Sequence, residues 1–128
     1  MSEKAIVIED DQMLNESLSE LLELMGINVI GQGFDGEDAV RLFTKNSPDY
    51  SLVDLSMPKF DGFYALEQIR IQDPKAIVFV VTGDTTSETK KRLEKLNATG
   101  IIYKPFKIED VVEKLRFAKS SLRTELAA

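Results

Sequence analysis

Short apolar runs alternate five times with segments of helical periodicity, and this alternation restricts the fold more than any other feature of the chain. Short apolar runs are typical of buried strands, whereas apolar residues spaced i, i+3, i+4 and i+7 indicate amphipathic helices. The run over residues 76–81 is the most apolar, so we expect it to form a central strand. Strands are predicted over residues 5–8, 27–30, 50–53, 76–81 and 101–103.

Each predicted strand is followed by a predicted helix. The first helix presents an apolar face and stops at Gly26, and Asp61 is predicted as the N-cap of the third. Five βα units with short connections predict a parallel sheet covered by helices on both sides. The first helix places Leu14, Leu18, Leu21, Leu22 and Met25 on one face, and the other helices are predicted over residues 36–46, 61–72, 85–97 and 108–122.

Asp54 closes the third apolar run and is followed by two pairs that break regular structure, Met57-Pro58 and Asp61-Gly62. The carboxyl end of a strand in an open α/β sheet is where ligands bind. A carboxylate at the end of a buried strand costs free energy unless it is paired. Asp54 is therefore the strongest candidate for a functional side chain.

Matching chemistry stands at three other strand ends: Glu9-Asp10-Asp11, Thr82-Gly83 and Lys104-Pro105. All strand ends of one direction meet at one edge of a parallel sheet, so we expect these side chains to converge on Asp54. Clustered carboxylates repel one another, and a hard divalent cation with oxygen ligands relieves that repulsion. A carboxylate can also attack phosphorus, while a lysine and a hydroxyl stabilise the phosphoryl oxygens.

The acid pair, Asp54, the Thr82 hydroxyl and Lys104 follow one another in this order along the chain. This order resembles that of the receiver domain of response regulators, and the resemblance extends from about Lys4 to about Leu122. The resemblance implies a flavodoxin-like (βα)5 fold, a three-layer sandwich with strand order 2-1-3-4-5. It implies a single receiver domain over residues 1–128, with a core over about residues 4–122. It also implies a signalling switch rather than a conventional enzyme, one that catalyses its own phosphorylation and dephosphorylation.

The same resemblance assigns a role to each site residue. Asp54 would be the phosphoacceptor, and Thr82 and Lys104 would assist the phosphoryl group. Mg²⁺ (or Mn²⁺) would be bound by Glu9, Asp10, Asp54 and the backbone carbonyl of Ser56. Asp11 is a competing acid that we interpret as part of the loop or helix entry, and the Lys104-Pro105 peptide bond would be cis.

Two further expectations concern what happens after phosphorylation. By the resemblance, Ser56 and Asp84 flank the path of the water that hydrolyses the acyl phosphate. Ile101 stands where the family carries an aromatic residue that turns inward, and a β-branched side chain has few rotamers. We therefore expect Thr82 and residues 83–86 to transmit the change, with Tyr103 adjusting beside them. The predicted output surface contains Lys91, Lys95 and Tyr103.

Composition excludes several classes of site. The chain has no histidine, which rules out a histidine-based triad, so any phosphohistidine must come from a partner. It has no cysteine, which fits a reducing compartment and predicts a cytoplasmic location. The net charge of −6 argues against nucleic-acid binding. Residues 1–4 lead directly into an apolar run, so we expect no signal peptide, and no run is long enough to span a membrane.

The expected partners are a histidine kinase or histidine phosphotransfer protein, a downstream protein target, and a second copy of the chain in a phosphorylation-dependent homodimer. With few residues after the last helix, we expect a stand-alone regulator, although a part of a longer regulator has the same pattern. The first alternative is a pseudo-receiver, a binding module of the same fold that is never phosphorylated.

Three other interpretations have less support in the sequence. A small Mg²⁺-dependent aspartyl-phosphate hydrolase is disfavoured because such enzymes carry a second aspartate where this chain has Ser56, and because they need a larger site. The segment Gly31–Gly36 matches a dinucleotide-binding motif but follows the second strand rather than the first, so we reject that function. An acidic triplet such as residues 9–11, taken alone, most often caps a helix.

Overall fold

The computed structural model describes residues 3–127, with side chains described through residue 123. Met1, Ser2 and Ala128 lie outside the described residues. The expectation that the chain has no signal peptide concerns residues 1–4, of which the first two are therefore not described. The strands are β1 (Glu3–Ile8), β2 (Ile27–Gly33), β3 (Tyr50–Asp54), β4 (Val78–Thr82) and β5 (Gly100–Tyr103). The helices are α1 (Gln12–Leu24), α2 (Gly36–Asn46), α3 (Gly62–Gln72), α4 (Ser87–Lys95) and α5 (Ile108–Ala127).

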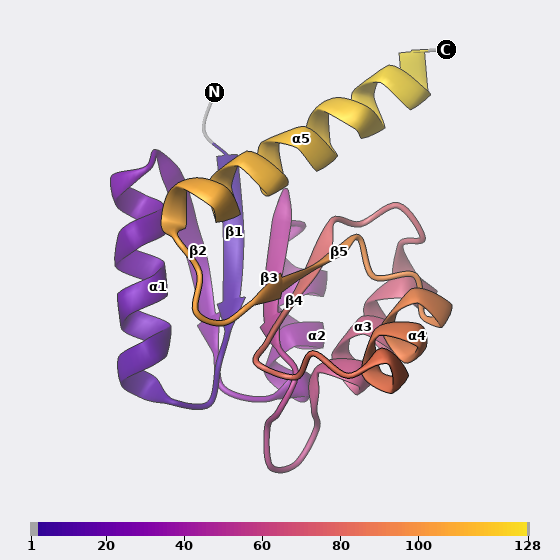
Figure 1. Cartoon of the computed structure of the whole chain (residues 1–128). Coiled ribbons are helices and arrows are strands. Elements are labelled where there is room, and N and C mark those ends of the chain that lie inside the picture. Colours follow the sequence, from indigo (N-terminus) through magenta and orange to yellow (C-terminus); the bar gives the residue numbers. More distant parts are fainter. Residues whose placement is uncertain (1–2, 128) are drawn as a thin grey trace.

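The five strands form one parallel sheet in the order β2-β1-β3-β4-β5, which confirms the flavodoxin-like fold (Figure 1). The middle strand is β3, every residue of which is buried. The run over residues 76–81 supplies β4, which lies between β3 and β5 and is an interior strand, as its apolar character predicts. Both strands are covered on two faces, so apolar content alone does not distinguish them.

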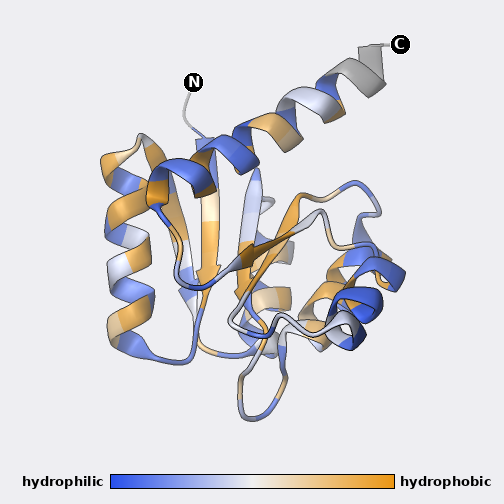
Figure 2. Ribbon diagram, viewed as in Figure 1, coloured by the Kyte–Doolittle hydropathy of each residue, from blue (hydrophilic) through white to orange (hydrophobic). Residues whose placement is uncertain are grey.

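Apolar side chains on the two faces of the sheet form two separate cores. The core on one face joins the sheet to α2, α3 and α4, and the other joins it to α1 and α5. Hydropathy colouring shows apolar strands between these layers and a largely hydrophilic α4 (Figure 2). In residues 3–127, no helix combines the length and the apolar character that crossing a membrane requires.

The predicted start of β4 is two residues too early, since the strand begins at Val78. The carbonyl of Ile77 accepts from the amide of Ser51 in β3 at 2.9 Å, but side chains bind the backbone on either side of it. Arg70 Nη1 donates to the carbonyl of Ala76 at 2.6 Å, and the amide of Val78 donates to Thr99 Oγ1 at 2.9 Å. The predicted start of α4 is also too early, because Thr86 is its N-cap and accepts from the amide of Thr89.

β2 continues through Gly31-Gln32-Gly33, three residues beyond its predicted end. The carbonyl of Gly33 accepts from the amide of Glu9 at 3.0 Å, which carries the pairing of β1 and β2 to the edge where the site lies. A Cβ on Gly33 would lie 2.7 Å from Cβ of Asp38 and 2.8 Å from Cδ1 of Ile8, so close packing explains this glycine.

Candidate functional site

The carboxyl edge of the sheet brings the predicted site residues together. Glu9 and Asp10 follow β1, Asp54 ends β3, Thr82 ends β4 and Lys104 follows β5. Glu9, Asp54 and Thr82 are buried, with exposed fractions of 6%, 6% and 3%, whereas Asp10 is exposed. Four strand ends thus place four kinds of side chain along one edge of the sheet, as the alternation of strands and helices predicts.

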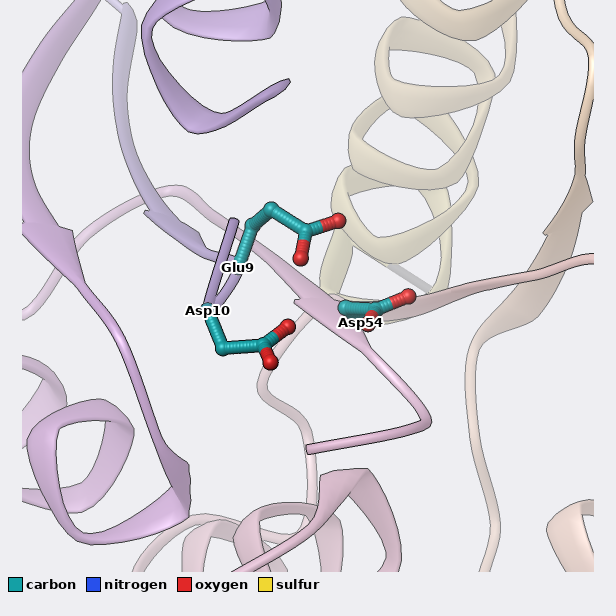
Figure 3. A group of neighbouring side chains, drawn as sticks. All are labelled: Glu9, Asp10 and Asp54. Carbon is teal, nitrogen blue, oxygen red and sulfur yellow. The ribbon is translucent and has the colours of Figure 1, made fainter. Parts of the chain in front are cut away.

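Glu9, Asp10 and Asp54 form an acidic cluster in which each offers one carboxylate oxygen within 4.8 Å of the others. The carboxylates come from the ends of two adjacent strands and face a common space (Figure 3). Burial raises the pKa of Glu9 and of Asp54 above their ordinary values, and neighbouring carboxylates add to both shifts. An oxygen-rich site whose charges repel one another fits a hard divalent cation such as Mg²⁺.

Lys104 supplies the positive charge of the site. Its Nζ lies 3.1 Å from Oδ1 of Asp54 and 3.3 Å from Oε1 of Glu9. These carboxylates outweigh the cost of burial and raise the pKa of Lys104 above its ordinary value. The Lys104-Pro105 peptide bond is cis, as the resemblance implies. The ammonium is thus placed where it can meet negative charge that develops on Asp54 or on a group bound to it.

Asp11 does not join the acidic cluster. Its side chain caps α1 by accepting from the amide of Leu14 at 3.2 Å, which confirms its interpretation as the helix entry. Its backbone amide donates to Oε2 of Glu9 at 3.1 Å. Asp11 therefore contributes by orienting the Glu9 carboxylate, and the three carboxylates of the cluster are those the sequence predicts.

Thr82 is linked to the first turn of α4 through Asp84. The Thr82 hydroxyl oxygen accepts from the amide of Asp84 at 3.0 Å, and the Asp84 carboxylate accepts from the amide of Thr86 and the hydroxyl of Thr89. These hydrogen bonds, that of Thr89 above all, lower the pKa of Asp84. A movement of the Thr82 hydroxyl would thus disturb the entry of α4 directly.

The loop between β3 and α3 is held by close backbone contacts. The amide of Gly36 donates to the carbonyl of Phe60 at 2.5 Å, and a Cβ on Gly36 would lie 2.7 Å from that oxygen. Gly36 and Gly33, both from the glycine motif of residues 31–36, therefore serve packing. This supports rejection of the dinucleotide-binding interpretation.

Two clefts reach the site. A cleft of about 470 Å³ is lined by Asp10, Ser56 and Asp84, among other residues, so the two side chains predicted to flank the water path share one opening. A second cleft, of about 310 Å³, lies beside Asp54 and Lys104 and is walled by apolar residues of α1 and by Phe106. The first cleft thus opens beside Asp10, and the second is lined by Asp54 itself.

We predict that a bulky side chain at position 56 or 84 lengthens the lifetime of an acyl phosphate on Asp54. Ser56→Tyr and Asp84→Tyr would each fill part of the cleft that they share with Asp10. The decay of the phosphorylated protein, followed by intact mass, measures this lifetime. Unchanged decay in both variants would show that water arrives by another route.

Sequence reasoning missed two features around the site. Leu14 and Leu21 belong to the predicted apolar face of α1, yet they are 50% and 38% exposed and line the apolar cleft. Asn15, in contrast, is 1% exposed and donates hydrogen bonds to the ends of β1 and β2. The available signal was a polar residue three positions before Leu18, on the buried side of the helix.

Comparison with known proteins shows the family to which the sequence is similar. The family model of the response regulator receiver domain matches residues 5–116. The chain is 34% identical over 124 residues to a probable C4-dicarboxylate response regulator, DctR, of Priestia megaterium, covering 94% of this chain and 54% of that protein. It is 31% identical over 114 residues to the chemotaxis protein CheY of Treponema pallidum, covering 88% and 79% respectively.

Solved structures share the fold. The crystal structure of a CheY-like receiver domain protein from Methanospirillum hungatei superposes with a TM-score of 0.89 at 21% identity, covering 98% of this chain and 99% of that one. The chain spans about half the length of the first curated relatives that it matches.

Proposed function

The chain belongs to the response regulator receiver domain family, whose members are signalling switches of two-component systems, and we propose that it is switched by phosphorylation of Asp54. The observation that carries this proposal is the buried Asp54 carboxylate, 3.1 Å from Lys104 and clustered with Glu9 and Asp10. We propose that residues 4–122 form the complete switching unit and that it works in the cytoplasm.

In the proposed reaction, a carboxylate oxygen of Asp54 attacks the phosphorus of a partner's phosphohistidine. A new O–P bond forms, the N–P bond breaks, and the histidine nitrogen leaves with its electron pair. Lys104 stabilises charge on the phosphoryl oxygens, and Thr82 can donate its hydroxyl proton to one of them. Mg²⁺, when held by Glu9, Asp10, Asp54 and the carbonyl of Ser56, would neutralise the charge of the cluster.

The apolar cleft supports a protein as the phosphoryl donor. Four of the large exposed apolar side chains lie on α1: Met13, Leu14, Leu21 and Leu24. Two of them, Leu14 and Leu21, line the cleft that ends at Asp54 and Lys104. An apolar surface leading to a nucleophile suits a partner that must exclude water while its histidine reaches Asp54. We therefore propose that a histidine kinase or phosphotransfer protein docks there.

A phosphotransfer screen tests this function. The protein is mixed in turn with purified, phosphorylated histidine kinases and phosphotransfer proteins of its host, and transfer of label is followed over time. Rapid transfer from one donor is expected, and Leu21→Glu, which places a charge in the apolar cleft, should slow it. No transfer from any donor, with no phosphorylation by a small phosphodonor either, would favour the pseudo-receiver alternative.

We predict that the phosphorylated state differs from the resting state mainly around β4, α4 and β5. Thr82 pairs with Tyr103 in the register of β4 and β5, and Ile101 packs against the core that includes Leu93 of α4. Beryllium fluoride with Mg²⁺ should mimic the phosphorylated state and shift the amide resonances of Thr86 and Tyr103. Changes confined to α1 and its neighbours would place the output surface elsewhere.

The proposed output surface contains Lys91, Lys95 and Tyr103, of which Tyr103 is 38% exposed. It would bind a downstream protein or a second copy of the chain once Asp54 is phosphorylated. Sedimentation with and without beryllium fluoride distinguishes these two occupants, because only the second raises the mass of the protein alone.

A further inference from the structure

Asn15 is a buried amide in the contact between α1 and the sheet, most of which is apolar. It lies one turn into α1, with an exposed fraction of 1%, on the side of the helix that also buries Leu18 and Leu22. A buried polar side chain costs free energy unless its hydrogen bonds are satisfied. The partners of this amide therefore indicate what it does.

The nitrogen of the Asn15 amide binds the carboxyl ends of β1 and β2, the first of which leads directly into the acid pair. Nδ2 donates to the carbonyl of Gly33 at 2.9 Å, to that of Glu9 at 3.1 Å and to that of Val7 at 3.4 Å. The carbonyl of Gly33 also accepts from the amide of Glu9. The backbone amide and the backbone carbonyl of Glu9 are therefore both hydrogen-bonded, the first to Gly33 and the second to Asn15.

The oxygen of the same amide is fixed from the other side. Oδ1 of Asn15 accepts from Nε2 of Gln32 at 2.8 Å and from Oγ of Ser19 at 3.3 Å. Gln32 Nε2 also donates to Oγ of Ser19 at 3.1 Å. Because an amide nitrogen only donates and an amide oxygen only accepts, these partners hold Asn15 in the orientation that directs its nitrogen at Glu9 and Gly33.

The carbonyl of Glu9 belongs to the same planar peptide unit as the amide nitrogen of Asp10. A hydrogen bond that fixes this oxygen therefore fixes the peptide that joins the two acids of the cluster. The Glu9 side chain is oriented separately, by the amide of Asp11 and by Lys104. Asn15 is thus placed to control the backbone from which both carboxylates project, although it does not belong to the acidic cluster.

We propose that Asn15 is a positioning residue for the acid pair and that its amide, oriented mainly by Gln32, sets the affinity of the site for a divalent cation. This inference rests on the proposed metal site. Partners that orient metal ligands without contacting the metal typically change affinity by about 10-fold or more. Loss of the Asn15 amide is expected to act in the same way, through the position of Glu9 and Asp10.

The test is the dissociation constant for Mg²⁺, measured on folded protein by NMR titration of the wild type, Asn15→Ala, Gln32→Ala and Ser19→Ala. Asn15→Ala should raise Kd about 10-fold, and amide hydrogen exchange at Asp10 should quicken without metal. Gln32→Ala, at an exposed strand residue, should raise Kd by a smaller factor. Ser19→Ala is the matched control, because it loses only the longer hydrogen bond to Asn15 Oδ1, at 3.3 Å, and leaves the 2.8 Å hydrogen bond from Gln32 in place.

Wild-type affinity in folded Asn15→Ala would overturn the inference, as would equal weakening in Asn15→Ala and Ser19→Ala. If Asn15→Ala does not fold, unchanged Kd in Gln32→Ala overturns it instead. A wild-type protein that does not bind Mg²⁺ at all contradicts the metal site itself and the inference with it. If the wild type binds Mg²⁺ and the variants bind it equally well, only the inference about Asn15 fails and the metal site stands.

Discussion

Asp54→Asn is expected to abolish phosphorylation by a small phosphodonor such as acetyl phosphate in the presence of Mg²⁺. The amide that replaces the carboxylate keeps the size of the side chain but lacks its nucleophilic oxygen. Wild-type protein should gain the mass of one phosphoryl group, and the group should be lost in acid or base as an acyl phosphate is. Intact mass spectrometry of both proteins, incubated side by side, measures the difference.

The same variant should be more stable than the wild type when Mg²⁺ is absent. The folded-state pKa of Asp54 is raised, chiefly by burial, so at neutral pH its carboxylate destabilises the folded state. Stability from protonation of Asp54 is present at low pH and is lost as pH rises through the raised pKa. An asparagine at position 54 carries no charge at any pH, so Asp54→Asn does not lose stability as the pH rises. Its free energy of unfolding should therefore exceed that of the wild type at pH 7. If Asp54→Asn is instead less stable than the wild type and gains no phosphoryl group, misfolding would explain its lack of phosphorylation.

Asp10→Ala is expected to remove the stabilisation that Mg²⁺ gives to the folded protein. At a free Mg²⁺ concentration of 100 times Kd, binding to the folded state alone should stabilise the wild type by about 2.7 kcal/mol. For a domain of this size, that corresponds to a rise in Tm of roughly 10 °C. Asp10 is the exposed member of the acidic cluster, so its replacement should remove a proposed metal ligand with little effect on packing.

Asp11→Ala is the matched control for Asp10→Ala. It removes an adjacent carboxylate that caps α1 but does not face the cluster, and loss of such a cap typically costs about 1 kcal/mol. Its Tm should therefore start lower and still rise with Mg²⁺ by nearly the wild-type amount. Thermal unfolding across a Mg²⁺ titration measures both effects. A Tm that is insensitive to Mg²⁺ in the wild type would favour the pseudo-receiver alternative.

The alternation of apolar runs with helical periodicity is enough to predict five βα units, because each element type has its own period. Strand order is not predictable in this way, since β3 and β4 are both buried on two faces; the order follows from the family resemblance. The beginning of β4 also escapes prediction, because Arg70 and Thr99 reach it from other parts of the fold.

The sequence predicts which residues form the candidate site, but it does not predict which residues orient them. Strand ends of one direction must meet at one edge, so the positions of Glu9, Asp54 and Lys104 in the sequence are enough to place them together. The choice between Asp10 and Asp11 depends on which of the two caps α1, a matter of local backbone geometry. Asn15 escapes prediction because its partners are backbone carbonyls, which leave no trace in a pattern of side chains.

Chemical mapping of the phosphorylated residue tests the central claim most directly. Borohydride reduces an aspartyl phosphate to the corresponding alcohol, which converts the labelled aspartate to homoserine and marks it permanently. Peptide mass spectrometry of protein phosphorylated with Mg²⁺ and a phosphodonor, then reduced, should find homoserine at position 54 and at no other acidic position. Reduction at position 10 or 11, or phosphate on a hydroxyl group that survives reduction, would contradict the assignment of Asp54 as the phosphoacceptor.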